Sequence, residues 1–362
     1  MPKPTTKTRL LLLSDTHTTP PSPRTFNTPY RQPLPAAQIL LHAGDITKVG
    51  LPSEHKSMLA LLKSHPAELK IVIAGNHDIT LDEGYYNRVG WLRHRHREPR
   101  GQDHLAALPK RTAESDTKPP PGSLEAGAEP ESPSPSAIKA LYTSPSAIDS
   151  GIRYMEEEIR TFVLPSTGAK FTVYASPYTP EFCAWAFAYP RSEDRFNPPS
   201  AGAGGGGATT PVPDYPGVDI LLTHGPPHGI LDQVVGSRQS VGCEHLYRAV
   251  RRARPALHVF GHIHEGYGAQ RVEWETSGSD SASTSISSGA RIKRVEEAPW
   301  DWEDVMEKRG AYVDVSSSSG RALRRGEETL FVNASVVTVE YKGLNPPWVV
   351  DLDLEVGEEN VQ

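Results

Sequence analysis

Five apolar segments of the sequence are each followed by side chains that can bind a metal ion or transfer a proton. These side chains are Asp15 and His17, Asp45, Asn76 with His77 and Asp78, His224, and His262 with His264. Because the loops beyond the carboxyl ends of strands form the ligand crevice of an α/β sheet, we expect them to converge on one site. Their oxygen and nitrogen donors suit a zinc, manganese or iron ion, and none of these motifs contains cysteine. The sequence therefore predicts a metal site built from distant parts of the chain.

The number of ligands indicates how many ions the site holds. The seven candidate ligands are Asp15, His17, Asp45, Asn76, His224, His262 and His264. A single zinc ion takes three or four protein ligands, so seven suit two ions that share a carboxylate better than one ion. Two ions about 3.5–4 Å apart can hold a bridging hydroxide and clamp the oxygens of a phosphate. We therefore predict two divalent metal ions as cofactors, of Mn, Fe or Zn, with Mg possible.

A site that cleaves phosphoesters also needs an acid for the leaving group. His77 adjoins a candidate ligand without being needed as one, and we predict that it protonates the leaving oxygen. Asp78 is the next residue, and we expect its carboxylate to set the tautomer of the His77 ring. Both are therefore predicted catalytic residues.

Each motif alone has an ordinary explanation, because Asp and Asn after a strand are frequent turn residues. Their common position at the ends of five apolar runs favours the metal site instead. His42 and His258 lie within such runs, and we expect them to be packed or to support the ligands. We expect solvated positions for His55, His65, His94, His96, His104 and His245. His228, four residues beyond His224, stays undecided between these classes.

The elements that must position these residues are short apolar runs typical of buried strands. They lie at residues 9–14, 38–43, 69–74, 170–175, 218–223, 256–260, 329–333 and 336–341. Helical spacing of apolar residues over Ser53–Ser64 and Cys243–Arg254 places helices between some of the strands. Later strands follow one another directly. We therefore predict an α/β fold with an antiparallel portion.

Three stretches interrupt this pattern, at residues 96–150, 196–216 and 273–325. They are rich in Pro, Gly, Ser and charged residues, so we expect largely disordered insertions, with a short helix around Trp300–Lys308 also compatible. Most of the 34 prolines lie in these stretches or before Ala36. The prediction is a single domain over residues 8–353 with a tail at 354–362.

Composition excludes several classes of protein. The formal net charge of −6 argues against general binding of nucleic acid or of an acidic membrane surface. Two cysteines exclude a disulfide framework, and we expect Cys183 and Cys243 to be buried. The apolar run Leu10–Leu13 is too short for a signal peptide, and no run is long enough to span a membrane, so we expect a cytoplasmic protein. The oligomeric state is left open.

The ordered set D-x-H, GD, GNHD, H and GHxH resembles the calcineurin-like metallophosphoesterase superfamily. The phrases SPYTPEFCAWAF and THGPPHGILD are similar to one branch, the metallophosphoesterase domain-containing proteins of animals and fungi. The resemblance covers roughly residues 8–95, 151–195, 217–270 and 329–353 and leaves the insertions without a counterpart. It implies an α+β sandwich, with two packed mixed β-sheets flanked by helices.

The resemblance also implies a role for each ligand. The first ion would be held by Asp15, His17, Asp45 and His264, and the second by Asp45, Asn76, His224 and His262. Asp45 would bridge the two ions, and His77 matches the family's proton-donating histidine.

We predict from this a dinuclear metal-dependent phosphoesterase that uses a metal-bridging hydroxide. Its partner would be a small phosphodiester or phosphomonoester, with a nucleotide-type substrate favoured. Two alternatives stay open. One is a protein Ser/Thr phosphatase with the same chemistry, and the other is a metal- and nucleotide-binding scaffold with little turnover.

Overall fold

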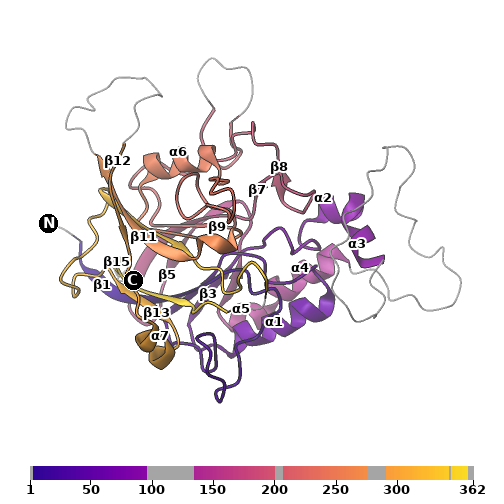
Figure 1. The fold of residues 1–362 in the computed structure, drawn as a ribbon, viewed down its shortest axis with the longest axis horizontal. Coiled ribbons are helices and arrows are strands. Elements are labelled where there is room, and N and C mark those ends of the chain that lie inside the picture. The colour runs from indigo at the N-terminus through magenta and orange to yellow at the C-terminus, as the bar shows by residue number, and fades with distance from the viewer. Residues whose placement is uncertain (1–2, 96–133, 200–206, 276–290, 342–343, 358–362) are drawn as a thin grey trace, which may run out of the picture.

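The computed structural model describes residues 3–95, 134–199, 207–275, 291–341 and 344–357. These residues form one large mixed β-sheet that folds into two packed halves, with helices on the outer faces (Figure 1). The predicted α/β sandwich is therefore confirmed.

The first half of the sheet carries the strands that lead to Asp15, Asp45 and Asn76. Its strands are, in spatial order, β13 (Ala311–Asp314), β15 (Trp348–Val356), β1 (Thr5–Leu13), β2 (Ile39–His42), β3 (Leu69–Val72) and β4 (Ile152–Tyr154). Strands β1 to β4 are parallel, and β15 runs antiparallel to β1.

The second half carries the strands that lead to the remaining histidine ligands. Its strands are, in spatial order, β5 (Glu158–Val163), β6 (Ala169–Ser176), β9 (Ile220–Thr223), β10 (Leu257–Phe260), β14 (Glu328–Asn333), β11 (Gly268–Glu275) and β12 (Arg291–Glu297). Strands β6, β9, β10 and β14 are parallel, and β5, β11 and β12 are antiparallel to their neighbours. The two halves are joined where β15 meets β6, through the pairs Glu355–Lys170 and Val356–Ala169.

The alternation of side chains along the strands produces the layers. Leu10 and Leu12 face the other half of the sheet, where they join a core that includes Val173 and Ile220. Leu11 and its neighbours on the opposite face pack under helices. Both faces are buried, and this explains why the strands read as continuous apolar runs.

Helices cover the two outer faces. The first half is covered by α1 (Pro52–Ser64), α4 (Pro135–Thr143) and α5 (Pro145–Asp149), and the second by α6 (Glu244–Ala253), as Figure 1 shows. Shorter elements are α2 (Glu83–Tyr85), a π-helical turn (Tyr86–Gly90), α3 (Trp91–Arg95), a 3-10 turn (His264–Gly266), α7 (Trp302–Lys308), and the paired strands β7 (Thr179–Pro180) and β8 (Ala188–Tyr189). Among the described residues, no helix is long and apolar enough to cross a bilayer.

Parts of the predicted insertions are ordered, so the expectation of disorder is wrong there. Residues 135–149 form α4 and α5, because Ile138 and Tyr142 lie four residues apart and pack into the core beside α1. Residues 291–314 contain β12, α7 and β13, and α7 confirms the short helix expected around Trp300–Lys308. Residues 96–133, 200–206 and 276–290 lie outside the described part of the chain.

Other differences between the predicted and the observed structure come from contacts between segments that are distant in sequence. Residues 336–341 contain one isolated bridge, at Val337, instead of the predicted strand. Strand β15 was not predicted and runs to Val356, three residues into the expected tail. His55 and His65 are buried, not solvated, because Tyr142, Thr80 and a backbone carbonyl accept or share their hydrogen bonds.

The remaining surface predictions have mixed outcomes. His94 and His245 are partly buried and hydrogen-bonded or ion-paired, and His96 and His104 fall outside the described residues. Cys243 is buried as predicted. Cys183 is exposed, contrary to the prediction, because it lies in a loop that carries it away from the core.

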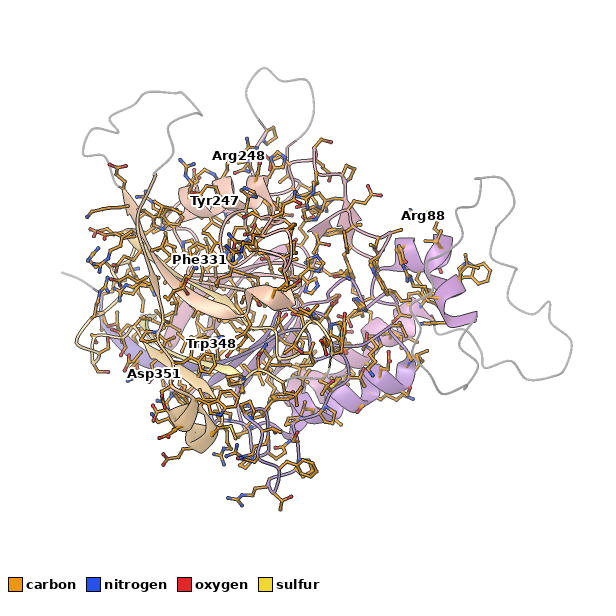
Figure 2. The ribbon with its side chains drawn as sticks, in the orientation of Figure 1. Arg88, Tyr247, Arg248, Phe331, Trp348 and Asp351 are labelled. Carbon is orange, nitrogen blue, oxygen red and sulfur yellow. The ribbon has the colours of Figure 1, made fainter. Side chains whose placement is uncertain are left out.

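The contribution of β15 can be tested at Trp348, which is fully buried and stacks on Tyr267 at 5.7 Å (Figure 2). We expect Trp348→Ala to lower the free energy of unfolding by about 3–5 kcal/mol, because it empties a packed site between β1 and β13. Trp302→Ala is the control, since that side chain is 53% exposed, and should cost less than about 0.5 kcal/mol. Urea unfolding followed by circular dichroism measures both. Equal effects would mean that β15 is not part of the core.

Candidate metal centre

The ligand motifs meet at one edge of the folded sheet, where parallel strands from both halves end. Asp15, Asp45 and Asn76 follow β1, β2 and β3, and His224 and His262 follow β9 and β10. Backbone hydrogen bonds join successive loops, for example from Asp15 N–H to the Gly44 carbonyl and from Gly261 N–H to the His224 carbonyl. The carboxyl ends of five strands therefore form a single site.

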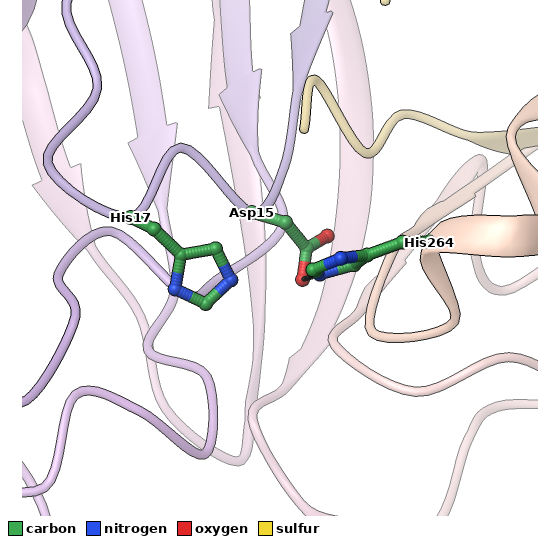
Figure 3. Close-up of side chains that lie close together, drawn as sticks. All are labelled: Asp15, His17 and His264. Atoms are coloured by element: carbon green, nitrogen blue, oxygen red, sulfur yellow. Dashed lines mark ion pairs between the residues drawn. The ribbon is translucent and has the colours of Figure 1, made fainter. Parts of the chain in front are cut away.

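Three overlapping groups of side chains could each hold a metal ion. Within each group, the ligand atoms all lie within 4.8 Å of one another. The groups are Asp15 with His17 and His264, His17 with Asp45 and His77, and Asp15 with Asp45 and His224. Figure 3 shows the first group, with Asp15 between His17 and His264. Asp15 and Asp45 each belong to two groups, so the two carboxylates connect the site.

Three of the four carboxylate oxygens of Asp15 and Asp45 face a histidine ring nitrogen. Oδ1 of Asp15 is 3.3 Å from Nε2 of His264. Asp45 has histidines on both sides, with Oδ2 3.6 Å from Nε2 of His17 and Oδ1 3.4 Å from Nε2 of His224.

Asn76 and His262 complete the set on the His224 side. Oδ1 of Asn76 is 2.9 Å from Nε2 of His224, and the His262 ring lies 5.0 Å from the His224 ring. The backbone N–H of His262 also donates to both oxygens of Asp15. The structure thus brings all seven predicted ligands together.

Buried hydrogen bonds orient the ligand rings. Nδ1 of His17 contacts the Thr47 carbonyl at 3.2 Å, and Nδ1 of His224 contacts the Ala43 carbonyl at 2.8 Å. These contacts leave Nε2 of each ring for coordination. Nε2 of His17 is buried without a hydrogen-bond partner, as expected of an atom that coordinates a cation. The donor set and its orientation therefore fit divalent metal ions.

Further residues surround the ligands, and one of them, Ser335, was not predicted from the sequence. Ser335 donates its hydroxyl to Asp15 Oδ2 at 2.8 Å and to Asn333 at 2.9 Å. His42 and His258 are buried, as expected, and contact the hydroxyls of Thr16 and Thr223, each of which adjoins a ligand.

The backbone at the ligands is strained. Asp15, His17, Asp45 and His262 have φ values of 52°, 43°, 52° and 66°, in the left-handed region that non-glycine residues rarely adopt. Such residues persist where the surroundings determine them, and they cluster at functional sites. Glycine is also required beside them, because a Cβ on Gly261 would lie 1.9 Å from Asp15 Oδ2.

Burial and the neighbouring charges act in opposite directions on the pKa values of the ligands. Burial alone would raise the pKa of Asp15 and Asp45, but hydrogen bonds and charge from His264 and His224 hold both below the usual range. Burial alone would lower the pKa of His224, but Asp45 outweighs it and raises that pKa to about 9. Burial lowers the pKa of His17 and of His262 to about 3, so both rings are neutral and able to coordinate.

His77 lies at the edge of the site, partly exposed, with its ring 4.7 Å from that of His17. Its Nδ1 contacts the Lys48 carbonyl at 2.7 Å. The prediction that Asp78 orients this ring is wrong. Asp78 is buried and accepts hydrogen bonds from Gly75 N, Ile46 N, Thr47 N and Thr47 Oγ1, which tie the loops after β2 and β3 together. Burial and the Asp45 charge raise its pKa to about 7.

Comparison with known proteins identifies the class of this site. The family model for calcineurin-like phosphoesterases matches residues 8–123, which contain the first three motifs. Metallophosphoesterase domain-containing protein 1 of Homo sapiens and of Mus musculus is 32% identical over 97% of this chain and 73% of their own length. The chain belongs to the calcineurin-like metallophosphoesterase family. A UPF0046 protein of Caenorhabditis elegans is 33% identical over 65% of this chain and 48% of its own.

Family membership defines the chemistry at a coarse level. The chain is a metal-dependent phosphoesterase, a hydrolase of phosphoric ester bonds. The family implies divalent metal ions, and the ligand groups described above are where they would bind. His228 belongs to none of those ligand groups. Its side chain is 42% exposed, and its Nδ1 lies 3.9 Å from Oδ2 of Asp232.

Metal binding should depend on pH through His224. With a pKa of about 9, this ring is protonated at pH 7 in the metal-free protein, and it must lose the proton to coordinate. We therefore expect proton release on metal binding at pH 7, and an apparent affinity that rises as the pH increases toward 9. Calorimetric titration of metal-free protein with Mn²⁺ in buffers of different ionisation enthalpy measures the protons released. His224→Gln should release fewer, and no proton release by the unmodified protein would contradict the assignment.

Proposed function

We propose that this metallophosphoesterase uses two metal ions bridged by Asp45 to hydrolyse a small phosphodiester or nucleotide-type substrate. The observation that carries the proposal is the position of Asp45, whose two oxygens face His17 on one side and His224 on the other. One ion would take Asp15, His17, Asp45 and His264, and the second would take Asp45, Asn76, His224 and His262.

Two divalent ions supply Lewis-acid activation of a water nucleophile and neutralise charge on the phosphoryl oxygens. The protein contributes orientation. Asp45 is fixed between the two groups by the backbone N–H of His77, which donates to its Oδ1 at 2.8 Å. The loops after β1, β2, β3, β9 and β10 hold the other ligands in a buried polar site.

The surroundings of His77 support its role as proton donor to the leaving oxygen. Because Nδ1 contacts the Lys48 carbonyl, Nε2 is the nitrogen left to carry the transferable proton. One ring nitrogen of His77 lies within 4.8 Å of Asp45 and His17 ligand atoms, so the donor borders the metal ligands without being buried among them.

An aromatic side chain beside the ligands supports a nucleotide-type substrate. The Tyr341 ring lies 5.0 Å from His17 and 5.2 Å from His264, and the residue is 47% exposed. An exposed ring next to a phosphate-binding site can stack on a base.

The cytoplasmic location expected from the sequence stays a prediction.

The dinuclear assignment is tested by Asp45→Asn, His17→Ala and His224→Ala. We expect Asp45→Asn to lower the occupancy of both ions, because the amide loses the negative charge shared by the two groups. His17→Ala and His224→Ala should each lower one. Asp351→Asn is the control, since Asp351 is also buried but pairs with Arg9 instead of a ligand. Elemental analysis of purified protein measures metal per chain. A single ion in the unmodified protein, or chelator-resistant activity, would contradict the proposal.

The proton-donor role is tested by His77→Ala. We expect metal content to stay near that of the unmodified protein, while turnover of esters with poor leaving groups falls by about 10²–10⁴-fold. Esters with good leaving groups should be little affected, because their oxygens depart without a proton. The measurement is kcat for methyl aryl phosphodiesters of graded phenol pKa. A uniform loss across the series would count against proton donation.

The substrate class is tested by a panel run with Mn²⁺, Zn²⁺, Fe²⁺ and Mg²⁺. The proposal predicts the highest kcat/KM on nucleotide diesters or monoesters. A preference for phosphopeptides would favour the protein phosphatase alternative, and tight nucleotide binding without hydrolysis would favour the scaffold alternative.

A further inference from the structure

The His77 ring is part of a stack of three side chains. The catalytic scheme above uses His77 but assigns no role to the other two. Trp185 stacks on His77 with ring centroids 4.0 Å apart and planes 26° from parallel. The guanidinium carbon of Arg93 lies 3.6 Å from the centroid of the Trp185 ring. Trp185 is therefore held between an imidazole and a guanidinium group.

The loop that presents Trp185 is strained. Cys183, Ala184 and Phe187, on both sides of the tryptophan, have φ values of 51°, 51° and 53°. Non-glycine residues occupy this left-handed region at a cost, and they remain there only where neighbouring structure determines them. Three such residues around one aromatic side chain point to a role for its position.

The segment that follows the GNHD motif supplies those constraints. Asp82 accepts a hydrogen bond from Phe187 N at 2.8 Å, and Tyr85 donates to the Ala184 carbonyl at 2.9 Å. Arg93 donates to the Tyr85 hydroxyl at 2.9 Å and to the same Ala184 carbonyl at 3.2 Å. One continuous segment thus carries His77 and also fixes the loop that stacks on it.

A hydrogen bond at Nδ1 alone does not fix the plane of an imidazole, because rotation about χ2 has broad minima. At His77 the contact with the Lys48 carbonyl defines which nitrogen is free, and the Trp185 face restricts the rotation of the ring. Together they determine which ring nitrogen is free and restrict the plane in which it lies. Asp78, expected to orient this ring, accepts hydrogen bonds from backbone N–H groups of its own loop and of the loop after β2 instead.

We propose that Trp185, clamped by Arg93, is the positioning residue that holds the proton-donating ring of His77 in its productive orientation. The inference rests on the proposed function, because it assumes that His77 protonates the leaving group. Trp185 acts through His77 and takes no part in metal binding.

The test uses the full chain loaded with Mn²⁺ and two substrates, methyl phenyl phosphate and methyl p-nitrophenyl phosphate. We expect Trp185→Ala to lower kcat on the phenyl ester by about 10- to 100-fold, the range for a misoriented catalytic group, and to leave the p-nitrophenyl ester almost unchanged. Arg93→Met should give a smaller loss of the same kind. Trp185→Phe should restore most of the activity, because it keeps an aromatic face.

Two controls separate this effect from a general disturbance. Trp302→Ala removes an indole that is 53% exposed, and Arg88→Met alters an exposed arginine of the turn before α3 (Figure 2). Neither should change the ratio of the two rates. Metal content and Tm are measured for every variant.

The decisive comparison is a double-mutant cycle with His77→Ala. If Trp185 acts through His77, Trp185→Ala adds no further loss in the His77→Ala background. An equal loss in both backgrounds, or no loss in either, overturns the proposal. If His77→Ala itself does not discriminate between the substrates, the proton-donor role fails, and the positioning role with it. Discrimination by His77→Ala but not by Trp185→Ala refutes the positioning role alone.

A spectroscopic measurement does not depend on turnover. In metal-free protein, the ring current of Trp185 shifts the imidazole C–H resonances of His77 upfield. Trp185→Ala should abolish that shift, whereas Trp302→Ala should leave it unchanged. Resonances of His77 that are identical in the Trp185→Ala variant and the unmodified protein would contradict the stacked geometry.

Discussion

Two buried carboxylates, Asp15 and Asp45, hold the two halves of this molecule in register at the site. Asp15 follows β1 in the first half of the sheet. It accepts hydrogen bonds from His262 N and Ser335 Oγ, which follow strands of the second half. Asp45 faces His224 across the same boundary. A carboxylate without access to water is costly unless cations or donors surround it. The need to satisfy these charges therefore requires the histidines, and the strands behind them, to meet at one place.

The same constraint explains the backbone around the ligands. Where a strand ends in a buried ligand, the backbone must turn sharply. The turn points the ligand side chain along the edge of the sheet and avoids a clash with the following residue. Asp15 and Asp45 accomplish this with positive φ values, and Gly261 leaves room for the Asp15 carboxylate where any Cβ would collide with it. The hydrogen bonds that Asp78 accepts from the loops after β2 and β3 stabilise this conformation. Local strain at the site is thus offset by contacts made away from the chemistry.

The ordered parts of the chain outside the resembling segments extend the core without entering the metal site. Helix α4 packs beside α1, where Tyr142 shares a hydrogen bond with the buried His55. Strand β12 extends the second half of the sheet, and β13 extends the first at β15. The chain is accordingly one folded sheet with added edges. The ligands come from the central strands, whose ends lie close together because their neighbours are parallel.

What the sequence alone determined is the set of candidate ligands. Asp, His and Asn at the ends of apolar runs carry their chemistry in their side chains, and the order of the motifs already indicates a metal-dependent phosphoesterase. The runs themselves predict β1, β2, β3, β6, β9, β10 and β14, because burial on both faces selects continuous apolar residues.

Only the tertiary structure decided which side chains surround the ligands and the His77 ring. Strand β15 contains alternating carboxylates, and it became a central strand through pairing with the distant β1 and β13. Asp78 adjoins His77 in sequence but points into the protein, whereas Trp185, more than a hundred residues away, covers the His77 ring. Spacing along the chain specifies which side chains are available. Their directions and neighbours depend on contacts between segments that are distant in sequence, and no local pattern encodes these.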